Sequence, residues 1–290
     1  VGFRLDDTVL PGLASRRLLE IRDARSGILI YRRPGARHHV PLKVFRMEFQ
    51  MLPLLKLDHH CGKHFQYELT GMERFGQETA LQAFHLNAVD SIYLSGRLHL
   101  RNFEEFFDKG FQVVGYLPDP YYEMASRLAL LKRLSQTQIT ILGERDRLAL
   151  ASAAAHFAEV VLDDERSLKK ALQTAGPRLR DVFVSPATRQ LVRFTSDQPV
   201  SRRDVASAID LLSRFAVVGQ DGAPMHFENA LAELLDLPLE DIPSVSRHSI
   251  LDAIAARLRR LPIVEGLLET DLILHHYVRE AAASHAFSAE

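Results

Sequence analysis

The sequence predicts an α/β protein in which helices cover a mostly parallel sheet on both faces. Short apolar, β-branched runs alternate along the chain with longer segments of helical spacing. This alternation is typical of units in which a helix connects two parallel strands. The chain has 290 residues, and no linker-like segment divides it. We therefore expect one domain over residues 1–290, built around one substantial core.

Four segments read as strands, and two of them carry clear end signals. Strands are expected over residues 27–31, 89–94, 111–117 and 214–219. The first enters a turn, 32–39, that contains Pro34 and Gly35. The third is the clearest buried strand, and Pro118 and Pro120 stop it.

The remaining periodic segments predict helices. They are expected over residues 102–107, 121–134, 145–159, 164–174, 201–212, 227–235, 249–260 and 265–283. Asn102 is the expected N-cap of the first of them. Residues 42–57 are apolar and basic with weak helical spacing, and 77–87 fit either a short helix or a strand.

Charge, cysteine content and hydropathy exclude several classes of function. Lys and Arg (36) nearly balance Asp and Glu (37), so a nucleic-acid binder that neutralises phosphates is not expected. Cys61 is the single cysteine, which excludes an intramolecular disulfide and predicts a reducing, cytoplasmic location. No apolar stretch is long enough to predict a membrane span, and the first residues do not resemble a signal peptide. Frequent Arg and Ala suggest a bacterial source.

The segment 93–126 resembles the carbohydrate sulfotransferases. In that family a Gly-His stretch leads into a short acidic-aromatic helix and a strand, and an Arg-Asp-Pro turn follows. A Ser stands eight residues after that Arg. Asp119 and Pro120 are in place here, and Ser126 has the family's spacing. Further matches follow in the same order at residues 185–191, 215–219, 227–235 and 269–277.

The resemblance implies a P-loop sulfotransferase-like three-layer fold and a specific donor. The donor would be 3′-phosphoadenosine-5′-phosphosulfate, and the acceptor a hydroxyl of a sugar or polysaccharide. The family holds the phosphosulfate in a Lys-bearing loop between the first strand and its helix. We expect this loop at residues 32–39, and the predicted donor contacts are Arg33, Gly35, Ala36, Arg37, Ser126 and Arg189. Arg33 is also assigned a catalytic role.

Several residues depart from the family's pattern. The turn 32–39 contains Arg but no Lys, and the two side chains differ in geometry. Pro118 stands where the family has the Arg that contacts the 3′-phosphate, and Arg127 or Arg189 could replace that charge. By register, Ser95 and Arg97 occupy positions where polysaccharide-acting members carry histidines. These departures leave open a basic surface turn and a Ser126 that touches no ligand.

His99 is the predicted general base, because it lies two residues beyond Arg97 and its ordinary pKa suits proton transfer. A half-buried histidine without a catalytic role is the plain alternative. The leading hypothesis is a transferase that moves a sulfuryl group to a carbohydrate hydroxyl. Two alternatives remain: a degenerate relative that binds a glycan, nucleotide or protein, and a transferase that uses a different activated donor.

Residues 58–64 concentrate side chains that can bind metals. A transition-metal site that uses His59 or His60, Cys61 and His64 is conceivable, and so is a Cys61 nucleophile paired with His64. The segment holds one cysteine without a second, so we predict no metal site. The sequence gives no oligomeric state.

Overall fold

The computed structural model describes residues 6–13, 15–16, 19–25, 27–33, 39–86, 89–137, 139 and 141–288, with side chains of the last helix described to residue 283. The strands are β1 (Glu20–Arg22), β2 (Leu29–Arg32), β3 (Lys43–Glu48), β4 (Tyr67–Leu69), β5 (Ile92–Gly96), β6 (Phe111–Leu117) and β7 (Val217–Gln220). The α-helices are α1 (Leu55–Gly62), α2 (Gln77–Phe84), α3 (Glu105–Asp108), α4 (Pro120–Leu134), α5 (Glu144–Phe157), α6 (Glu165–Thr174), α7 (Pro177–Arg180), α8 (Pro186–Val192), α9 (Asp204–Leu212), α10 (Pro224–Leu235), α11 (Ser249–Leu258), α12 (Pro262–Leu267) and α13 (Glu269–Ser288). Short 3₁₀ turns are η1 (Met72–Arg74), η2 (Leu100–Asn102), η3 (Asp181–Phe183) and η4 (Leu239–Asp241).

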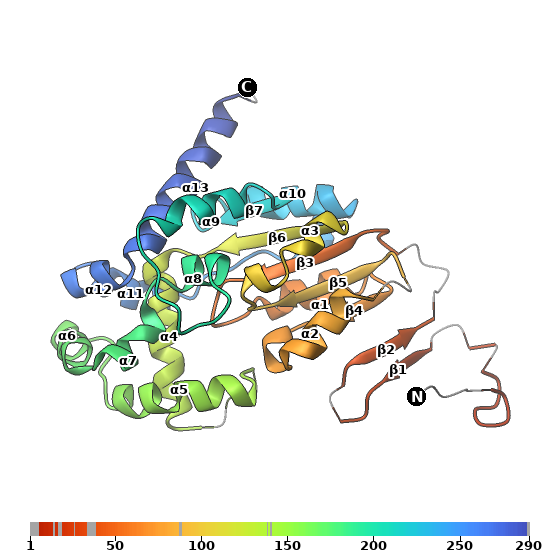
Figure 1. Cartoon of the computed structure of the whole chain (residues 1–290), viewed down its shortest axis with the longest axis horizontal. Coiled ribbons are helices and arrows are strands. Elements are labelled where there is room, and N and C mark those ends of the chain that lie inside the picture. The colour runs from red at the N-terminus through yellow and green to blue at the C-terminus, as the bar shows by residue number, and fades with distance from the viewer. Residues whose placement is uncertain are drawn as a thin grey trace.

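The core is a five-stranded parallel sheet with helices on both faces, as the sequence predicts. The strand order is β4-β5-β3-β6-β7, so the first strand of this sheet, β3, lies at its centre. Helices α1 and α10 pack on one face, and α2, α3 and α9 pack on the other. Figure 1 shows this sandwich, with α13 leaving the body toward the C-terminus.

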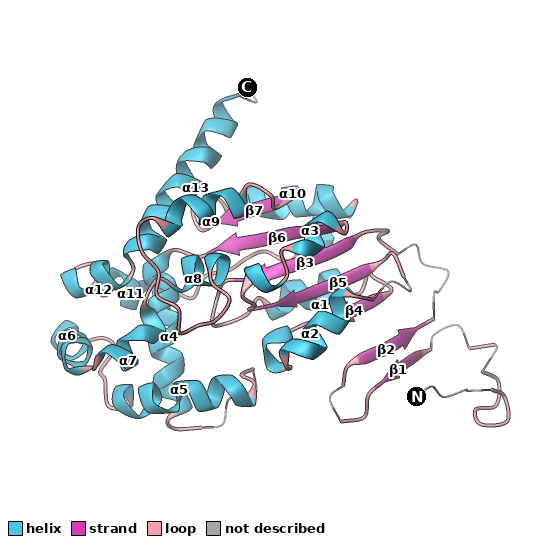
Figure 2. Ribbon diagram, viewed as in Figure 1, coloured by secondary structure: helices cyan, strands magenta, loops and turns pink. Residues whose placement is uncertain are grey.

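A second helical group lies beyond the carboxyl ends of the strands. It consists of α4, α5, α6, α11 and α12, which share an apolar cluster of their own. The strand arrows in Figure 2 point toward this group. The group thereby covers the edge at which open α/β sheets bind their ligands.

The strand predicted over 27–31 exists, but it does not belong to the parallel sheet. It overlaps β2, which pairs antiparallel with β1 in a separate two-stranded ribbon. The ribbon lies away from the helical group that covers the carboxyl ends (Figure 2). The expectation that residues 32–39 form the first strand-to-helix loop of the sheet is therefore wrong.

The first strand of the sheet is β3, inside the segment 42–57 to which we assigned weak helical spacing. Its sequence mixes charges into an apolar run, because Arg46 and Glu48 alternate with Phe45 and Met47. All four side chains are buried, and the two charges are paired with each other. The two charges made the hydropathy pattern of this segment unlike that of a buried strand, because their compensation inside the protein is not visible in the local sequence.

Two other local predictions meet different outcomes. The predicted strand 111–117 is confirmed, because β6 has the same bounds. The prediction that Asn102 caps a helix is wrong: it ends the 3₁₀ turn η2, and its side-chain amide donates to the carbonyl of Phe194. A contact with a residue distant in the sequence decides its role.

Candidate functional site

The sheet topology places a switch point between the carboxyl ends of β3 and β6, and we call the region between the loops that follow these two strands the crevice. From β3 the chain leaves to helix α1 on one face, whereas the connections β5–α3–β6 and β6–α9–β7 use the other face. Neighbouring strands whose connections leave to opposite faces form a topological switch point, where ligands of open α/β sheets bind. The loop 49–54 after β3 and the turn 118–119 after β6 therefore flank the expected ligand position.

The buried side chain of Glu48 binds backbone amides of the loop after β3. Its carboxylate accepts hydrogen bonds from the backbone amides of Gln50, at 2.9 Å, and Leu54, at 2.8 Å. It also accepts one from the Nη1 of Arg46, at 2.9 Å. Glu48 is 1% exposed. Backbone amides that could hold an anion at this loop are thus already bonded to the protein's own carboxylate.

The cluster continues from Arg46 into helix α1. Arg46 donates to both carboxylate oxygens of Asp58, at 2.6 and 2.8 Å, and the hydroxyl of Tyr93 donates to Asp58 at 2.8 Å. Two carboxylates on one guanidinium satisfy its fork of donors. This network fixes β3, β5 and α1 together directly beneath the loop.

The turn after β6 starts helix α4 by ordinary N-terminal signals. The Asp119 side chain accepts from the amide of Tyr122 at 3.0 Å, and Pro120 occupies the first helical turn, where its missing N–H costs nothing. Glu123 follows one turn later on the same side of the helix. Asp119 therefore orients a helix that carries Glu123 into the crevice.

Glu123 bridges the two loops of the switch point. One of its carboxylate oxygens, Oε1, accepts from the amide of Met51 at 3.0 Å and from the Nε of Arg127 at 2.7 Å. The other oxygen, Oε2, is buried and has no partner among the described residues. Burial raises the pKa of Glu123 to about 7, against the opposing effect of Arg127. A carboxyl group with such a pKa can take up or release a proton near neutral pH.

Ser126 lies three residues after Glu123 and is 2% exposed. Its hydroxyl has no hydrogen-bond partner among the described residues. The neighbouring Arg127 is also buried and donates to the carbonyl of Val182 at 3.0 Å, besides its bond to Glu123. Ser126 is thus a buried, unsatisfied hydroxyl at the carboxyl edge, and Arg127 is held in place by the protein.

Helix α8 covers the crevice. The side-chain amide of Gln190 donates to the carbonyl of Glu48 at 3.0 Å. Asp271 on α13 accepts from the amides of Ala187 and Thr188 and from the Thr188 hydroxyl, which holds the first turn of α8. These bonds tie α8 to both the central strand and α13.

Arg189, predicted to contact the donor, points into its own ion pair. Its two terminal nitrogens donate to the two carboxylate oxygens of Asp181, at 2.9 and 2.8 Å, and it reaches the carbonyl of Ser196 at 2.9 Å. Arg189 is only 7% exposed. Its charge is thus compensated within the fold.

His99, the predicted base, lies just beyond the end of β5 and next to α8. Burial lowers its pKa, and the nearby guanidinium groups of Arg189 and Arg145 act in the same direction. Its Nδ1 is buried without a partner among the described residues. The structure thus brings His99 and Arg189 together, and it places Ser126 at the same edge of the sheet.

Arg33 does not join this group. It lies at the end of β2, and its guanidinium donates to the carbonyls of Leu13 and Arg16 in the N-terminal segment. The neighbouring Arg32 donates to the carbonyl of Phe65, just before β4 and so at the amino edge of the sheet. Gly35, Ala36 and Arg37 lie outside the described residues. Among the described residues, Arg33 is thus bonded to the N-terminal segment, and it forms no hydrogen bond with the Ser126 hydroxyl.

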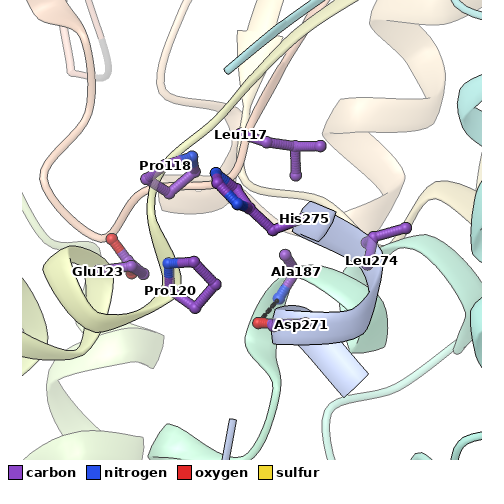
Figure 3. A pocket seen from close by; sticks show the side chains of 8 residues that line it. All are labelled: Leu117, Pro118, Pro120, Glu123, Ala187, Asp271, Leu274 and His275. Atoms are coloured by element: carbon purple, nitrogen blue, oxygen red, sulfur yellow. Dashed lines mark hydrogen bonds between the residues drawn. The ribbon is translucent and has the colours of Figure 1, made fainter. Parts of the chain in front are cut away.

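Pro118 lines a small cavity at the end of β6 (Figure 3). The cavity has a volume of about 10 Å³, and its lining includes Glu123 and His275. In Figure 3 Glu123 comes from α4 and His275 from α13. The wall that Pro118 contributes to this cavity is apolar.

The histidine-rich segment 58–64 forms no site with the geometry of a metal centre. No group of three metal-capable side chains occurs among the described residues. Cys61 is buried between α1 and the sheet, and burial raises its pKa to about 12. A thiol with this pKa is protonated at neutral pH, so the structure does not support Cys61 as a nucleophile.

Sequence reasoning missed Glu48, Gln50, Glu123, Gln190 and His275. Glu123 could have been found, because it stands four residues after Asp119 and so shares its helix face. Glu48 and Gln190 carried no such signal, since a contact across 142 residues joins them.

Comparisons with family models, curated proteins and solved structures give no match to this chain. The fold and the crevice define its class: an α/β protein with a five-stranded parallel sheet and a closed switch point. In the described part of the chain, no helix combines the length and apolar character that crossing a membrane requires.

Proposed function

We propose that this chain is a sulfotransferase-like protein that binds a hydroxyl-rich ligand of the carbohydrate class, and that it does not transfer a sulfuryl group. The observation that carries this proposal is the carboxylate of Glu48 on the amides of Gln50 and Leu54. In a P-loop sulfotransferase-like architecture, which we propose for this sheet, the loop after the first parallel strand would hold the phosphosulfate. A buried carboxylate already occupies the donors that such a loop would offer.

The charges around the crevice support the same conclusion. Guanidinium groups are present, but they are paired with carboxylates: Arg46 with Asp58, Arg97 with Asp146, Arg127 with Glu123 and Arg189 with Asp181. A donor with a 3′-phosphate and a 5′-phosphosulfate brings several negative charges. It would have to break these pairs, and for Asp58 and Glu123 this would leave a buried carboxylate uncompensated, which is costly.

The unsatisfied polar atoms of the crevice favour a neutral ligand. Buried side-chain atoms without a partner among the described residues include Gln50 Nε2, Glu123 Oε2, Ser126 Oγ and Gln190 Oε1. Buried polar atoms in native proteins are nearly always hydrogen-bonded, so such a group calls for water or a ligand. The set contains both donors and acceptors, and carbohydrate hydroxyls both donate and accept. The single buried cysteine supports a cytoplasmic location for this activity.

Isothermal titration calorimetry with 3′-phosphoadenosine-5′-phosphate tests the loss of the donor site. We expect no binding at millimolar nucleotide, in wild type and in Ser126→Ala alike. Micromolar binding that Ser126→Ala or His99→Ala weakens would overturn the proposal in favour of sulfuryl transfer.

A second titration tests carbohydrate binding directly. The probes are neutral oligosaccharides, namely maltotriose, cellotriose and chitotriose. We expect at least one to bind and Gln190→Ala to weaken that binding. Gln136→Ala, which removes an exposed amide just after the end of α4, should leave the affinity unchanged. Equal affinity in wild type and Gln190→Ala would place the carbohydrate elsewhere and contradict the proposal.

A further inference from the structure

The segment 243–248, which we call the strap, connects η4 to α11 without forming a helix or a strand. Pro243, Val245 and Arg247 are half-buried, and the three residues that alternate with them are exposed. This alternation is typical of an extended chain that lays one face on the protein. The strap is thus a surface segment with an inner and an outer side.

Side chains of other elements hold the backbone of the strap near both of its ends. The amide of Val245 donates to the carboxylate of Glu228, on α10, at 2.7 Å. The amide of His248 donates to the hydroxyl of Tyr122, on α4, at 3.0 Å. Both bonds run from the strap's backbone to a side chain, so strand pairing does not hold it.

Arg247 connects the strap to the turn after β6. Its guanidinium binds the carboxylate of Asp221, just after β7, and lies 4.2 Å from the centre of the Tyr122 ring. Asp221 in turn accepts a hydrogen bond of 2.7 Å from the amide of Asp119. Because Asp119 belongs to the turn 118–119, the strap lies beside the switch point, at the carboxyl ends of β6 and β7.

The strap is held more weakly than α8, which covers the crevice. Helix α8 buries residues 188–192, and three hydrogen bonds join its first turn to Asp271. None of the six residues of the strap is buried, and Val245 packs only partly against the apolar cluster under α10. Segments with few buried apolar contacts open at a low cost in free energy. We therefore expect the strap to open before α8 does.

A ligand at the switch point needs such an opening. The cavity at the end of β6 has a volume of about 10 Å³, which holds no more than one water. Beside it, Tyr122 is 5% and Glu228 is 7% exposed. Lifting the strap would release Asp221, Glu228 and the Tyr122 hydroxyl from their bonds, and each of these groups can accept a hydrogen bond from a hydroxyl.

We propose that the strap is a lid that opens as a unit, with Arg247 as its latch, and that its opening admits the ligand to the switch point. The inference rests on the proposed function for the identity of the ligand, whereas the opening is a property of the chain alone. Arg247 acts as the latch because lifting the strap separates its guanidinium from Asp221 and from the face of Tyr122.

Hydrogen–deuterium exchange of the full chain, followed by nuclear magnetic resonance, tests the opening without a ligand. The amides of Val245 and His248 report on the strap, and the amides of β3, at the centre of the sheet, report on global unfolding. We expect weaker protection and a weaker response to urea at the strap, because a local opening exposes less surface. Equal protection and equal urea dependence at both places would show that the strap opens only when the protein unfolds, and would overturn the lid.

Arg247→Gln tests the latch. Exchange of both strap amides should become about tenfold faster, because a charge-assisted hydrogen bond is lost, while the amides of β3 keep their protection. Arg260→Gln, which removes an exposed guanidinium 3.8 Å from Glu165, is the matched control and should leave the strap amides unchanged. Exchange that is the same in Arg247→Gln and wild type would refute the latch.

Tyr122→Phe tests whether the strap opens as a unit. This variant removes the acceptor of the His248 amide and keeps the ring beneath Arg247. If the strap opens in one step, exchange at Val245 also becomes faster, although Val245 is bonded to Glu228 and not to Tyr122. A change confined to His248 would show local fraying and contradict the lid.

Relaxation-dispersion measurements of oligosaccharide association separate the lid from the proposed function. The probe is whichever of maltotriose, cellotriose and chitotriose binds in the titration. Its association rate should rise in Arg247→Gln by the same factor as strap exchange, because both require the open strap. An unchanged association rate would show that the ligand enters elsewhere and would overturn the lid. If none of the three binds, the proposed function fails, and the exchange experiment still decides whether the strap opens.

Discussion

The carboxylate of Glu123 accepts a hydrogen bond of 3.0 Å from the backbone amide of Met51. This bond connects the loop after β3 to the helix after β6. One hydrogen bond thus joins the segments that follow β3 and β6, the two strands of the switch point. With Arg127 on the same oxygen, it seals the crevice by a carboxyl group whose pKa lies at about 7. The protonation state of this carboxyl group is therefore sensitive to pH near neutrality.

This sensitivity predicts a pH dependence of stability. Burial raises the folded pKa of Glu123 from 4.5 to about 7, so the folded state binds a proton that the unfolded state has released. The contribution of Glu123 is complete below pH 4.5 and is lost as the pH rises through 7. Its total is about 3 kcal/mol. Urea unfolding measures the free energy of unfolding of wild type and of Glu123→Gln from pH 4.5 to 8. The difference between the two should fall by this amount over that range.

Comparison of the two proteins at each pH removes the contributions of other groups. The raised pKa of Asp271 acts in the same direction, and the lowered pKa values of His99 and His275 act in the opposite one. These contributions are common to both proteins. A difference that stays constant from pH 4.5 to 7 would contradict the raised pKa.

Removal of Glu48 should destabilise the protein strongly. In Glu48→Ala the buried Arg46 loses one of its two carboxylate partners, and the amides of Gln50 and Leu54 lose their acceptor. Breaking a buried pair costs about 3–5 kcal/mol, which urea denaturation would measure. Glu105→Ala, which removes an exposed pair with Lys109, is the control and should leave the unfolding midpoint unchanged. Equal midpoints for the two variants would refute the buried role of Glu48.

Arg189→Lys should fail to replace the native side chain. The pair with Asp181 is bidentate, and an ammonium group offers no planar fork. We expect a loss of about 1–3 kcal/mol in the free energy of unfolding. Arg202→Lys, at an exposed pair with Glu269, should leave the midpoint where it is. If Arg189→Lys is as stable as wild type, Arg189 is free to serve a ligand after all.

Gly96 should not tolerate a methyl group. A Cβ at this position would lie 2.7 Å from the backbone nitrogen of Met72 and 2.8 Å from its Cβ. Gly96→Ala should therefore cost about 1–3 kcal/mol by overpacking at the end of β5. Gly266→Ala in α12 is the control, because nothing lies within 4 Å of the new atom. It should be neutral or stabilising by up to about 1 kcal/mol. Differential scanning calorimetry compares the two, and equal midpoints would contradict this packing.

The sequence predicted the class of fold and most of its helices from local signals. The strand 111–117 was predictable in its bounds, because Gly110 and Pro118 flank an apolar run and a proline has no N–H to donate to a sheet. The first strand was not predictable in this way. Arg46 and Glu48 look unfavourable in a buried strand until Asp58 and the loop amides are placed around them.

The candidate site was also predictable only in part from the sequence. The resemblance to the carbohydrate sulfotransferases predicted Ser126 and His99, and both lie at the carboxyl edge with unsatisfied atoms. The assignment of Arg33 to the same site depends on a first sheet strand at residues 27–31, whereas the strand found there, β2, belongs to the separate ribbon. Its real partners are the carbonyls of Leu13 and Arg16.

The amino-acid sequence by itself determined that helices and parallel strands alternate, because hydrophobic periodicity and proline positions act over a few residues. Only the tertiary structure decided which strand stands at the centre, and that Glu48 fills the loop beside it. Those outcomes depend on Asp58, which compensates the buried charge of Arg46 from 12 residues away, and on Gln190, which binds the backbone carbonyl of Glu48 from 142 residues away. The free energy of a buried charge is set by its neighbours in space, and local sequence does not name them.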